Sequence, residues 1–318
     1  MPTEPKKRIS IVTPCYNEEG NVEELHALIG AVMAKHPQYD YDHLFIDNAS
    51  ADRTVEILRR IAAEDPRVTV IVNTRNFGHI RSPYYGLLQG RGDAVIILAS
   101  DLQDPPDLIS QFLKKWEEGY KIVMGVKIAS EETLAMWLVR KAYYWFISSV
   151  AEISLVKNAT GFGLYDQRVI ELLRTIDDPY PYFRGLVSEL GFPPAIVPYK
   201  QAVRKRGITS NNFYTLYDLA MLGVTNHSKA PLRLATMAGF AFASLNALVA
   251  FAYVIAKLVW WNEFSLGVAP LVIGVFFMSS VQLFFVGIIG EYVGSIYTQV
   301  LRRPLVIEKE RIHCGERP

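Results

Sequence analysis

The first hundred residues alternate between short apolar runs and longer segments in which apolar residues recur with helical spacing. The apolar runs are rich in branched side chains, which is typical of buried strands, and they lie at residues 9–13, 43–46, 69–72 and 94–98. The segments between them have the periodicity of amphipathic helices, at 22–35, 54–63 and 80–89. Strands and helices that alternate at this spacing predict an α/β domain with a mostly parallel sheet.

The last third of the chain differs, because charged residues disappear over two long stretches. No charge occurs from Leu234 to Ala256 or from Phe264 to Gly290, and a helix needs about 20 apolar residues to cross a bilayer. We therefore predict two transmembrane helices, at about 233–259 and 266–294, joined as a hairpin. Basic residues flank the outer ends of the pair, so the positive-inside rule places both termini in the cytoplasm. The prediction is a multi-pass protein of the inner membrane.

Composition narrows the class of protein further. The 318 residues include 33 Lys and Arg against 32 Asp and Glu, a net charge of +1, which argues against nucleic acid as a partner. The two cysteines, Cys15 and Cys314, lie at opposite ends of the chain and form neither a disulfide framework nor a zinc motif. A reducing compartment is the natural interpretation.

Polar loops follow each of the four predicted strands. They span residues 14–19, 47–52, 74–79 and 99–106. In an open parallel sheet the ligand lies outside the carboxyl ends of the strands, so these loops are expected to meet at one edge. Asp47 could accept the N3–H of a uracil ring, and Tyr16 offers an aromatic face. Asp101 is an oxygen ligand suited to Mg²⁺ or Mn²⁺ bridging a diphosphate, whereas Asp104 fits either a helix N-cap before Pro105 or a catalytic or sugar-binding role.

These loops, in this order, resemble the family-2 glycosyltransferases of Rossmann-like GT-A fold. Within that family they are similar to the polyprenyl-phosphate branch, of the dolichol-phosphate-mannose-synthase-like or bacterial undecaprenyl-phosphate glucosyltransferase type. The matching segments cover nearly the whole chain and are residues 14–19, 47–54, 75–78, 101–106, 160–164, 229–233 and 287–292. The resemblance implies transfer of a sugar from a nucleotide donor to undecaprenyl phosphate, with a divalent metal as cofactor. Such proteins also form tetramers, so a homo-oligomer is expected.

The resemblance also implies roles for particular residues. The residues expected to hold the nucleotide sugar are Pro14, Tyr16, Asn17, Glu18, Asp47, Asn76, Asp101 and Arg204. Those expected at catalytic positions are Asp101, Asp104 and Arg206. Asp101 and Gln103 fall where the metal ligands belong, and Lys127, Arg140 and Lys141 fall near positions that receive the lipid phosphate.

The chain departs from the family pattern at several positions. Ala99 replaces the first acid of the D-x-D motif, Asn48 replaces the second acid of the D-D-G-S loop, and Gly161 replaces a carboxylate of a Gly-Asp-Phe-Arg segment. A phosphate monoester has a second pKa of roughly 6, so it needs no general base near pH 7. An inverting, in-line displacement assisted by metal and cationic groups therefore remains the expected chemistry.

We expect a division into a GT-A nucleotide-sugar-binding catalytic domain (1–211), an interfacial helix or linker (212–231), the two transmembrane helices (232–299) and a cytoplasmic tail (300–318). Residues 133–156 interleave aromatic and basic side chains and predict an amphipathic helix on the membrane surface. The alternative is that this helix packs its aromatic residues into the soluble core. A second interfacial helix is expected at 212–224.

Two other functions compete with this interpretation. A processive polysaccharide synthase of the same superfamily would carry a Q-x-x-R-W motif, which does not occur in this sequence. A non-catalytic membrane scaffold with a degenerate site would account for Ala99, Asn48 and Gly161. Among donors, UDP-glucose is preferred, with UDP-N-acetylglucosamine, UDP-galactose or a modified pentose as alternatives.

Overall fold

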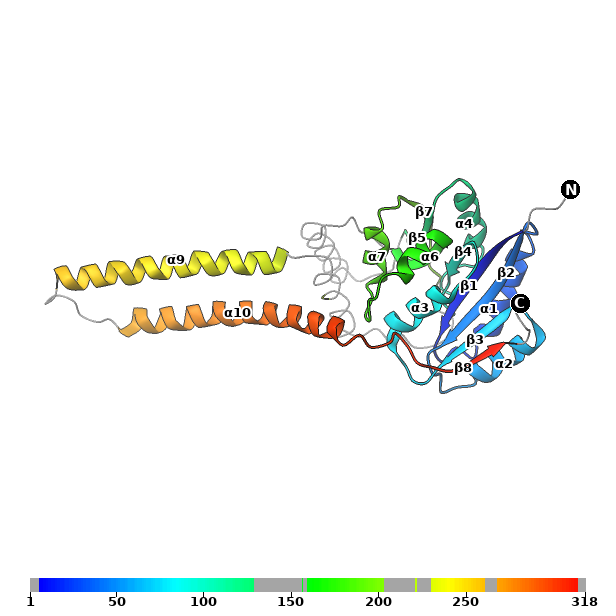
Figure 1. Ribbon diagram of the computed structural model, residues 1–318, viewed down its shortest axis with the longest axis horizontal. Helices are drawn as coiled ribbons and strands as arrows, with labels where there is room; N and C mark the ends of the chain where they lie inside the picture. The colour runs from blue at the N-terminus through cyan, green and yellow to red at the C-terminus, as the bar shows by residue number, and fades with distance from the viewer. Residues whose placement is uncertain are drawn as a thin grey trace.

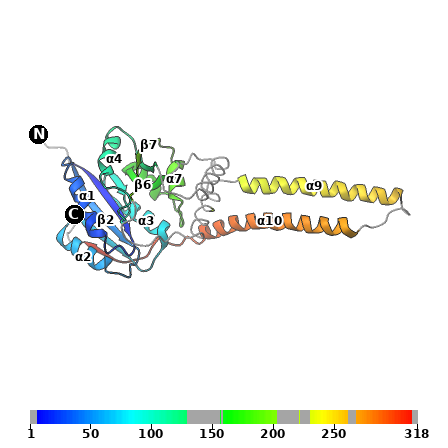
Figure 2. The ribbon, with the colours of Figure 1, turned by 180° about the vertical axis from the view of Figure 1, so that it is seen from behind.

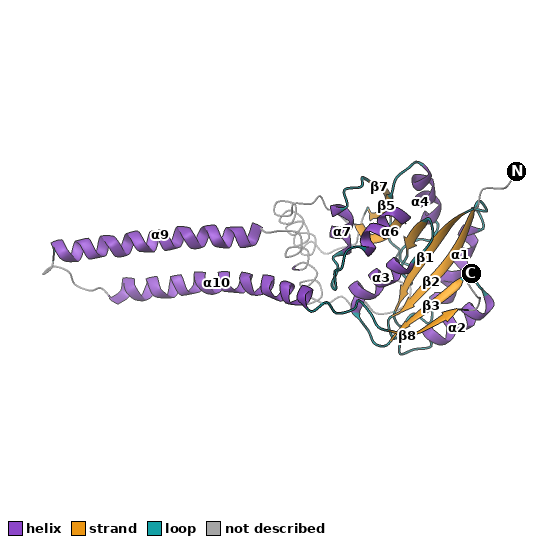
Figure 3. Cartoon of the chain, viewed as in Figure 1, coloured by secondary structure: helices purple, strands orange, loops and turns teal. Residues whose placement is uncertain are grey.

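The strands form one mixed sheet with the order β7-β5-β6-β4-β1-β2-β3-β8. The computed structural model describes residues 6–128, 156, 159–202, 221, 230–260 and 268–313, and an α/β domain continues into two long helices that project from one end (Figure 1). The strands are β1 Lys7–Cys15, β2 Tyr39–Asp47, β3 Val68–Asn73, β4 Ala94–Ile97, β5 Ile122–Lys127, β6 Ala159–Asp166, β7 Pro194–Tyr199 and β8 Glu308–His313. Figure 3 shows that all strands lie within the α/β domain.

Helices cover both faces of the sheet. They are α1 Val22–Met33, α2 Thr54–Glu64, α3 Gly78–Gln89, α4 Leu108–Glu117, α6 Gln167–Arg174 and α7 Phe183–Glu189. The apolar stripes of α1 and α4 pack on one face, with Leu25 and Phe112 fully buried, and α3, α6 and α7 pack on the other, with Leu87 and Ile170 fully buried. The helices thus bury the apolar periodicity that the sequence shows.

The predicted α/β class with a mostly parallel sheet is confirmed. Strands β4, β1, β2 and β3 are neighbours and run parallel, so their carboxyl ends meet at one edge. On the other side of β4 lies β6, which runs antiparallel to both of its neighbours, β4 and β5. The four predicted strands and three predicted helices all occur, and most extend by one to four residues beyond their predicted ends.

The C-terminal tail is part of this sheet. The sequence predicts no helix or strand in residues 300–318, but β8 pairs antiparallel with β3. The backbone N–H of Thr74 donates to the carbonyl of Ile307 at 2.9 Å, and the Tyr85 hydroxyl donates to Glu308 at 2.7 Å. The tail therefore covers the edge of β3 and ties the end of the long helices to the α/β domain.

The two long helices are α9 (Ala230–Val259) and α10 (Val268–Val300), and they lie side by side in both views (Figures 1 and 2). Among the described residues, Gly274–Val300 is long and apolar enough to cross a membrane, and none of its most apolar stretch is buried within the protein. One such segment does not confirm the predicted two-helix transmembrane hairpin. The predicted interfacial helices at 133–156 and 212–224 lie almost entirely outside the described residues.

Candidate active site

The loops after β1 and β2 are cross-linked at the carboxyl edge of the sheet. The N–H of Asn17 donates to Ser50 Oγ at 2.9 Å, and Asn17 Oδ1 accepts the N–H of Ala51 at 2.8 Å. The buried Glu18 carboxylate accepts a hydrogen bond from Asn21 Nδ2 within the same loop. The side chains of Asn17 and Glu18, which were predicted to hold the nucleotide sugar, thus support the loops that shape the site.

Asp47 and Tyr16 lie at the same edge in different environments. Asp47 is fully buried at the end of β2, and its two oxygens accept hydrogen bonds from the N–H and the hydroxyl of Ser50. Burial raises the pKa of the Asp47 carboxyl above its ordinary value, while the Ser50 hydrogen bonds act in the opposite direction. Tyr16 is 45% exposed, so its ring is accessible to a flat ligand.

Asn48 joins three segments of chain through its amide. Its Oδ1 accepts hydrogen bonds from the N–H of Phe77 at 2.9 Å and from Asn73 Nδ2 at 3.2 Å. Its Nδ2 donates to Asn76 Oδ1 at 2.9 Å and to the carbonyl of Gly78 at 3.2 Å. Asn76, another predicted ligand for the nucleotide sugar, therefore helps to connect the loop after β2 with the start of α3.

The loop after β4 brings Asp101 and Gln103 together. Leu102 between them has a positive φ of 56°, and the N–H of Gln103 donates to Asp101 Oδ1 at 3.2 Å. Ser100 Oγ donates to the carbonyl of Pro14 at 3.0 Å, which fixes this loop against the end of β1. The two predicted metal ligands thus belong to one loop that is fixed at Pro14, and the Gln103 side-chain amide donates to the carbonyl of Ala202 at 3.4 Å.

The oxygen atoms of this loop suit a metal that binds together with the substrate. Within the part of the chain that the structure describes, no group of three His, Cys, Asp or Glu side chains is arranged to hold a metal ion. Mg²⁺ is commonly held by one or two carboxylates plus substrate phosphates and water. The half-buried Asp101 carboxylate with the Gln103 amide fits that donor set but not a site closed by protein alone.

Asp104 lies beneath the same edge and is buried. It accepts a hydrogen bond from the Tyr199 hydroxyl at 2.5 Å. Burial raises the pKa of its carboxyl, while Tyr199 and the nearby Lys127 ammonium act in the opposite direction. The N-cap of α4 is Asp107, so the interpretation of Asp104 as the cap of that helix is wrong.

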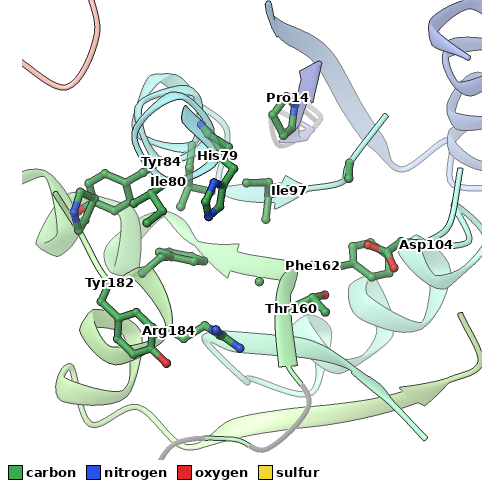
Figure 4. A pocket seen from close by; sticks show the side chains of 16 residues that line it. Pro14, His79, Ile80, Tyr84, Ile97, Asp104, Thr160, Phe162, Tyr182 and Arg184 are labelled. Atoms are coloured by element: carbon green, nitrogen blue, oxygen red, sulfur yellow. The ribbon is translucent and has the colours of Figure 1, made fainter. Parts of the chain in front are cut away.

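A cavity of about 430 Å³ opens beside Asp104, between α3, β4, β6 and α7. Pro14, Ala99 and Asp104, which follow β1 and β4, line one side of it, and the rest of its wall is mainly apolar and aromatic. His79 from α3 and Arg184 from α7 point into it from opposite walls (Figure 4). Neither residue was predicted from the sequence as part of the site, and burial lowers the pKa of His79. His79 ends one of the four polar loops, which was the available signal, whereas Arg184 belongs to no motif.

Several predicted site residues cannot be placed. Arg140, Lys141, Arg204 and Arg206 lie outside the described residues. Lys127 is half-buried at the end of β5 and close enough to Asp104 to lower its pKa.

Comparison with known proteins decides the family. A family model described as Glycosyl transferase family 2 matches residues 10–171. The chain belongs to glycosyltransferase family 2. This glycosyltransferase is 34% identical to the uncharacterized glycosyltransferase YkcC of Bacillus subtilis, over 94% of this chain and 92% of the relative. It is 33% identical to the SfII prophage-derived bactoprenol glucosyl transferase of Shigella flexneri, over 95% of this chain and 98% of the relative.

Solved structures similar to this glycosyltransferase share less sequence. The glucosyl-3-phosphoglycerate synthase of Mycobacterium tuberculosis, in complex with Mn²⁺, UDP and phosphoglyceric acid, matches with a TM-score of 0.47 and 20% identity over 69% of this chain and 76% of that one. A mannosyltransferase from Pyrobaculum calidifontis in complex with GDP-Man and Mn²⁺ matches with a TM-score of 0.46 and 15% identity over 94% and 87%.

Two departures of this glycosyltransferase from the family pattern lie at the cavity. Ala99 and Gly161 both line it. Gly161 has a positive φ of 96°, a conformation that disfavours a residue with a Cβ atom, and its carbonyl accepts the Tyr165 hydroxyl at 2.9 Å. Among the described residues lining the cavity, Asp104 is the single acid.

Proposed function

We propose that this glycosyltransferase transfers a sugar from a nucleotide-sugar donor to a polyprenyl phosphate at the cytoplasmic face of the inner membrane. One observation carries the proposal. The similarity to relatives named bactoprenol glucosyl transferase covers 95% of this chain and 98% of those relatives. The match therefore includes the long helices as well as the α/β domain.

The proposed donor is a UDP-sugar, with UDP-glucose as the first choice. Tyr16 is exposed and could stack on the base, and Asp47 lies at the end of the neighbouring strand. The cross-linked loops around Asn17 and Asn48 support these two residues. The buried floor of the site is formed before the donor arrives, which lowers the entropic cost of binding.

The proposed reaction is an inverting displacement at the anomeric carbon. An oxygen of the acceptor phosphate forms the new bond to that carbon as the bond to the donor's diphosphate breaks, and the nucleoside diphosphate leaves with the electron pair. A phosphate dianion needs no base, so the residues of the chain act by alignment and by electrostatic stabilisation. A Mg²⁺ or Mn²⁺ ion held by Asp101, Gln103 and the substrate would neutralise charge on the departing diphosphate.

We further propose that α9 and α10 cross the membrane as a hairpin and that both termini are cytoplasmic. In this division of the chain, the catalytic domain ends at residue 211, the interfacial helix or linker at 231 and the transmembrane helices at 299. Large apolar side chains face outward along both helices, and Phe240 and Phe276 are 72% and 71% exposed. So much outward apolar surface on long helices is suited to lipid rather than water.

The decisive experiment incubates the purified full-length protein with undecaprenyl phosphate, Mn²⁺ and a panel of labelled nucleotide sugars. Label that extracts with lipid, for one donor above the others, is the expected result. Binding of a nucleotide sugar without any lipid-linked product would instead favour the non-catalytic scaffold.

The metal assignment has its own test. Asp101→Asn removes the charge of the proposed ligand while preserving its size, and we expect turnover to fall about 100-fold or more because a ligand to the ion is weakened. Full turnover in this variant would refute the assignment.

A further inference from the structure

The cavity between α3 and α7 is suited to part of the acceptor, and this assignment rests on the proposed function. Arg184 is the one described lining residue with a permanent positive charge, and it enters the cavity from α7. His79 enters from α3 (Figure 4), and burial lowers the pKa of its imidazole, so it contributes a neutral hydrogen-bond donor. We propose that this cavity is the subsite for the acceptor's phosphate group, and that Arg184 and His79 bind it in addition to Lys127, Arg140 and Lys141, the residues that the family resemblance implies.

The charge of the cavity suits an anion. Arg184 is half-buried, and its Nη1 donates to the carbonyl of Ala159 at 3.1 Å while the guanidinium lies 5.5 Å from the Tyr182 ring centre. Those contacts hold the side chain in place but use only part of its five N–H donors. A guanidinium held this way binds a phosphate at a reduced entropic cost.

The scarcity of acidic side chains in the wall also favours an anionic ligand. Ala99 and Gly161 line this cavity at positions where the family pattern has carboxylates. A carboxylate at either position would repel a phosphate dianion, because like charges a few ångströms apart interact unfavourably where water screens them weakly. Because those acids are missing, a phosphate entering the cavity meets Asp104 as the single described acid in the wall.

The cavity is also connected to the long helices on both of its walls. Gln299, at the end of α10, donates from Nε2 to Asp178 Oδ1 at 2.9 Å, in the segment that leads to Tyr182 and α7. On the other wall, Arg81 of α3 donates to the carbonyl of Pro304, just after α10. The end of α10 and the chain after it therefore contact helix α3, which carries the imidazole, and the segment that precedes α7, the helix with the guanidinium. The elements of the cavity thus lie next to the end of a helix that we propose to cross the bilayer.

The apolar part of the wall fits the remainder of such an acceptor. Ile80, Tyr84 and Phe183 line the same cavity as Arg184 and His79. An isoprenyl chain next to the phosphate would bury apolar surface there, and the dry surroundings would strengthen the phosphate's interaction with Arg184.

The test uses the full-length protein in detergent, with undecaprenyl phosphate titrated at saturating donor. We expect Arg184→Gln to raise the KM for undecaprenyl phosphate about tenfold or more, because a charge-assisted hydrogen bond is lost. The KM for the nucleotide sugar is expected to stay within about twofold of the wild-type value. Arg184→Lys keeps the charge and is expected to recover part of the loss, and His79→Gln to show a smaller increase of the same kind.

Arg168→Gln is the matched control, since Arg168 is an exposed arginine about 6.0 Å from the Phe192 ring and outside the cavity lining. It is expected to change neither KM. An unchanged KM for undecaprenyl phosphate in Arg184→Gln, or an increase confined to the KM of the nucleotide sugar, would overturn the proposal. The second outcome would place the donor's sugar in the cavity instead.

A binding arm separates this proposal from the proposed function. Farnesyl phosphate and farnesol share one chain and differ in the phosphate, so each is titrated into the wild type and into Arg184→Gln in the presence of UDP. We expect the variant to lose affinity for farnesyl phosphate only. If the wild type glycosylates no polyprenyl phosphate, the proposed function fails whatever this arm shows, and equal affinities of both proteins for farnesyl phosphate refute the subsite alone.

Discussion

Asn48 stands where the resembled family has an aspartate, so Asn48→Asp tests whether this chain needs the amide. The side-chain oxygen of Asn48 accepts two hydrogen bonds, and its nitrogen donates to Asn76 Oδ1 and to the carbonyl of Gly78. A carboxylate keeps the accepting side but has no hydrogen to donate. Its second oxygen would face two other oxygens in a buried position.

The cost follows from these contacts. Two hydrogen bonds are lost, each with a net contribution of about 1 kcal/mol, and the buried carboxylate oxygen that replaces Nδ2 is left without a donor at a cost of up to about 2 kcal/mol. We expect a total destabilisation of roughly 2–4 kcal/mol at pH 7, or a decrease in Tm of about 4–15 °C for an α/β domain of this size. The penalty is expected to shrink at pH 5, because a protonated carboxyl can donate one of the two missing hydrogen bonds.

The assay is thermal unfolding of the full-length protein in detergent, followed by tryptophan fluorescence at both pH values. Asn76→Asp is the matched control. Asn76 uses its Oδ1 to accept from Asn48 and from the N–H of Gly78, and a carboxylate can accept both. Its expected change is below about 1 kcal/mol. Equal Tm values for the two variants at pH 7 would refute the reasoning.

Two further changes test the packing of the α/β domain. Burial lowers the pKa of His43, and the charge of the neighbouring His26 lowers it further. The unfolded chain therefore binds a proton at this residue more readily than the folded chain below about pH 6.5, so the stability of the fold decreases as the pH falls. Tm measured from pH 8 to pH 5 is expected to decrease less steeply in His43→Gln, and equal slopes would contradict this. Gly163→Ala would place a Cβ atom 2.3 Å from the Val123 carbonyl oxygen, so we expect the free energy of unfolding to fall by about 1–3 kcal/mol. Gly30→Ala in α1 is the control, because the added Cβ would make only ordinary contacts, and it is expected to be neutral or stabilising. Similar Tm values for the two variants would refute the clash.

The sequence predicted the central strands well because their burial is visible in the pattern. Ile9, Ile11 and Ile96 are fully buried between helices, so β1 and β4 appear as continuous apolar runs. Strand β8 has no such signal, because its residues Glu308–His313 are mostly charged and alternate between half-buried and exposed. Pairing of its backbone with β3 decides its structure, and no local pattern reports a partner more than 200 residues away.

The sequence predicted where the loops of the candidate site lie better than it predicted what their side chains contact. The rule for parallel sheets located the edge, and the structure brings Pro14, Asp101 and Asp104 to it. Whether a polar side chain faces a ligand or its own backbone depends on geometry that residue type does not reveal. Asn17 has a positive φ of 54° and accepts a hydrogen bond from the neighbouring loop, as asparagine commonly does in turns.

The three departures from the family pattern have different physical consequences, and this weighs against a merely degenerate site. Asn48 makes four hydrogen bonds, and an aspartate could not make the two that its Nδ2 donates, which is a gain of structure. Ala99 and Gly161 each remove a negative charge from the lining of the cavity that also contains Arg184. If substitutions had accumulated at random in a site without function, both missing acids would not be expected to lie in the cavity that contains Arg184. In the proposed reaction two anions must approach each other, so fewer carboxylates at the acceptor's position lower the repulsion that the metal and Arg184 have to overcome.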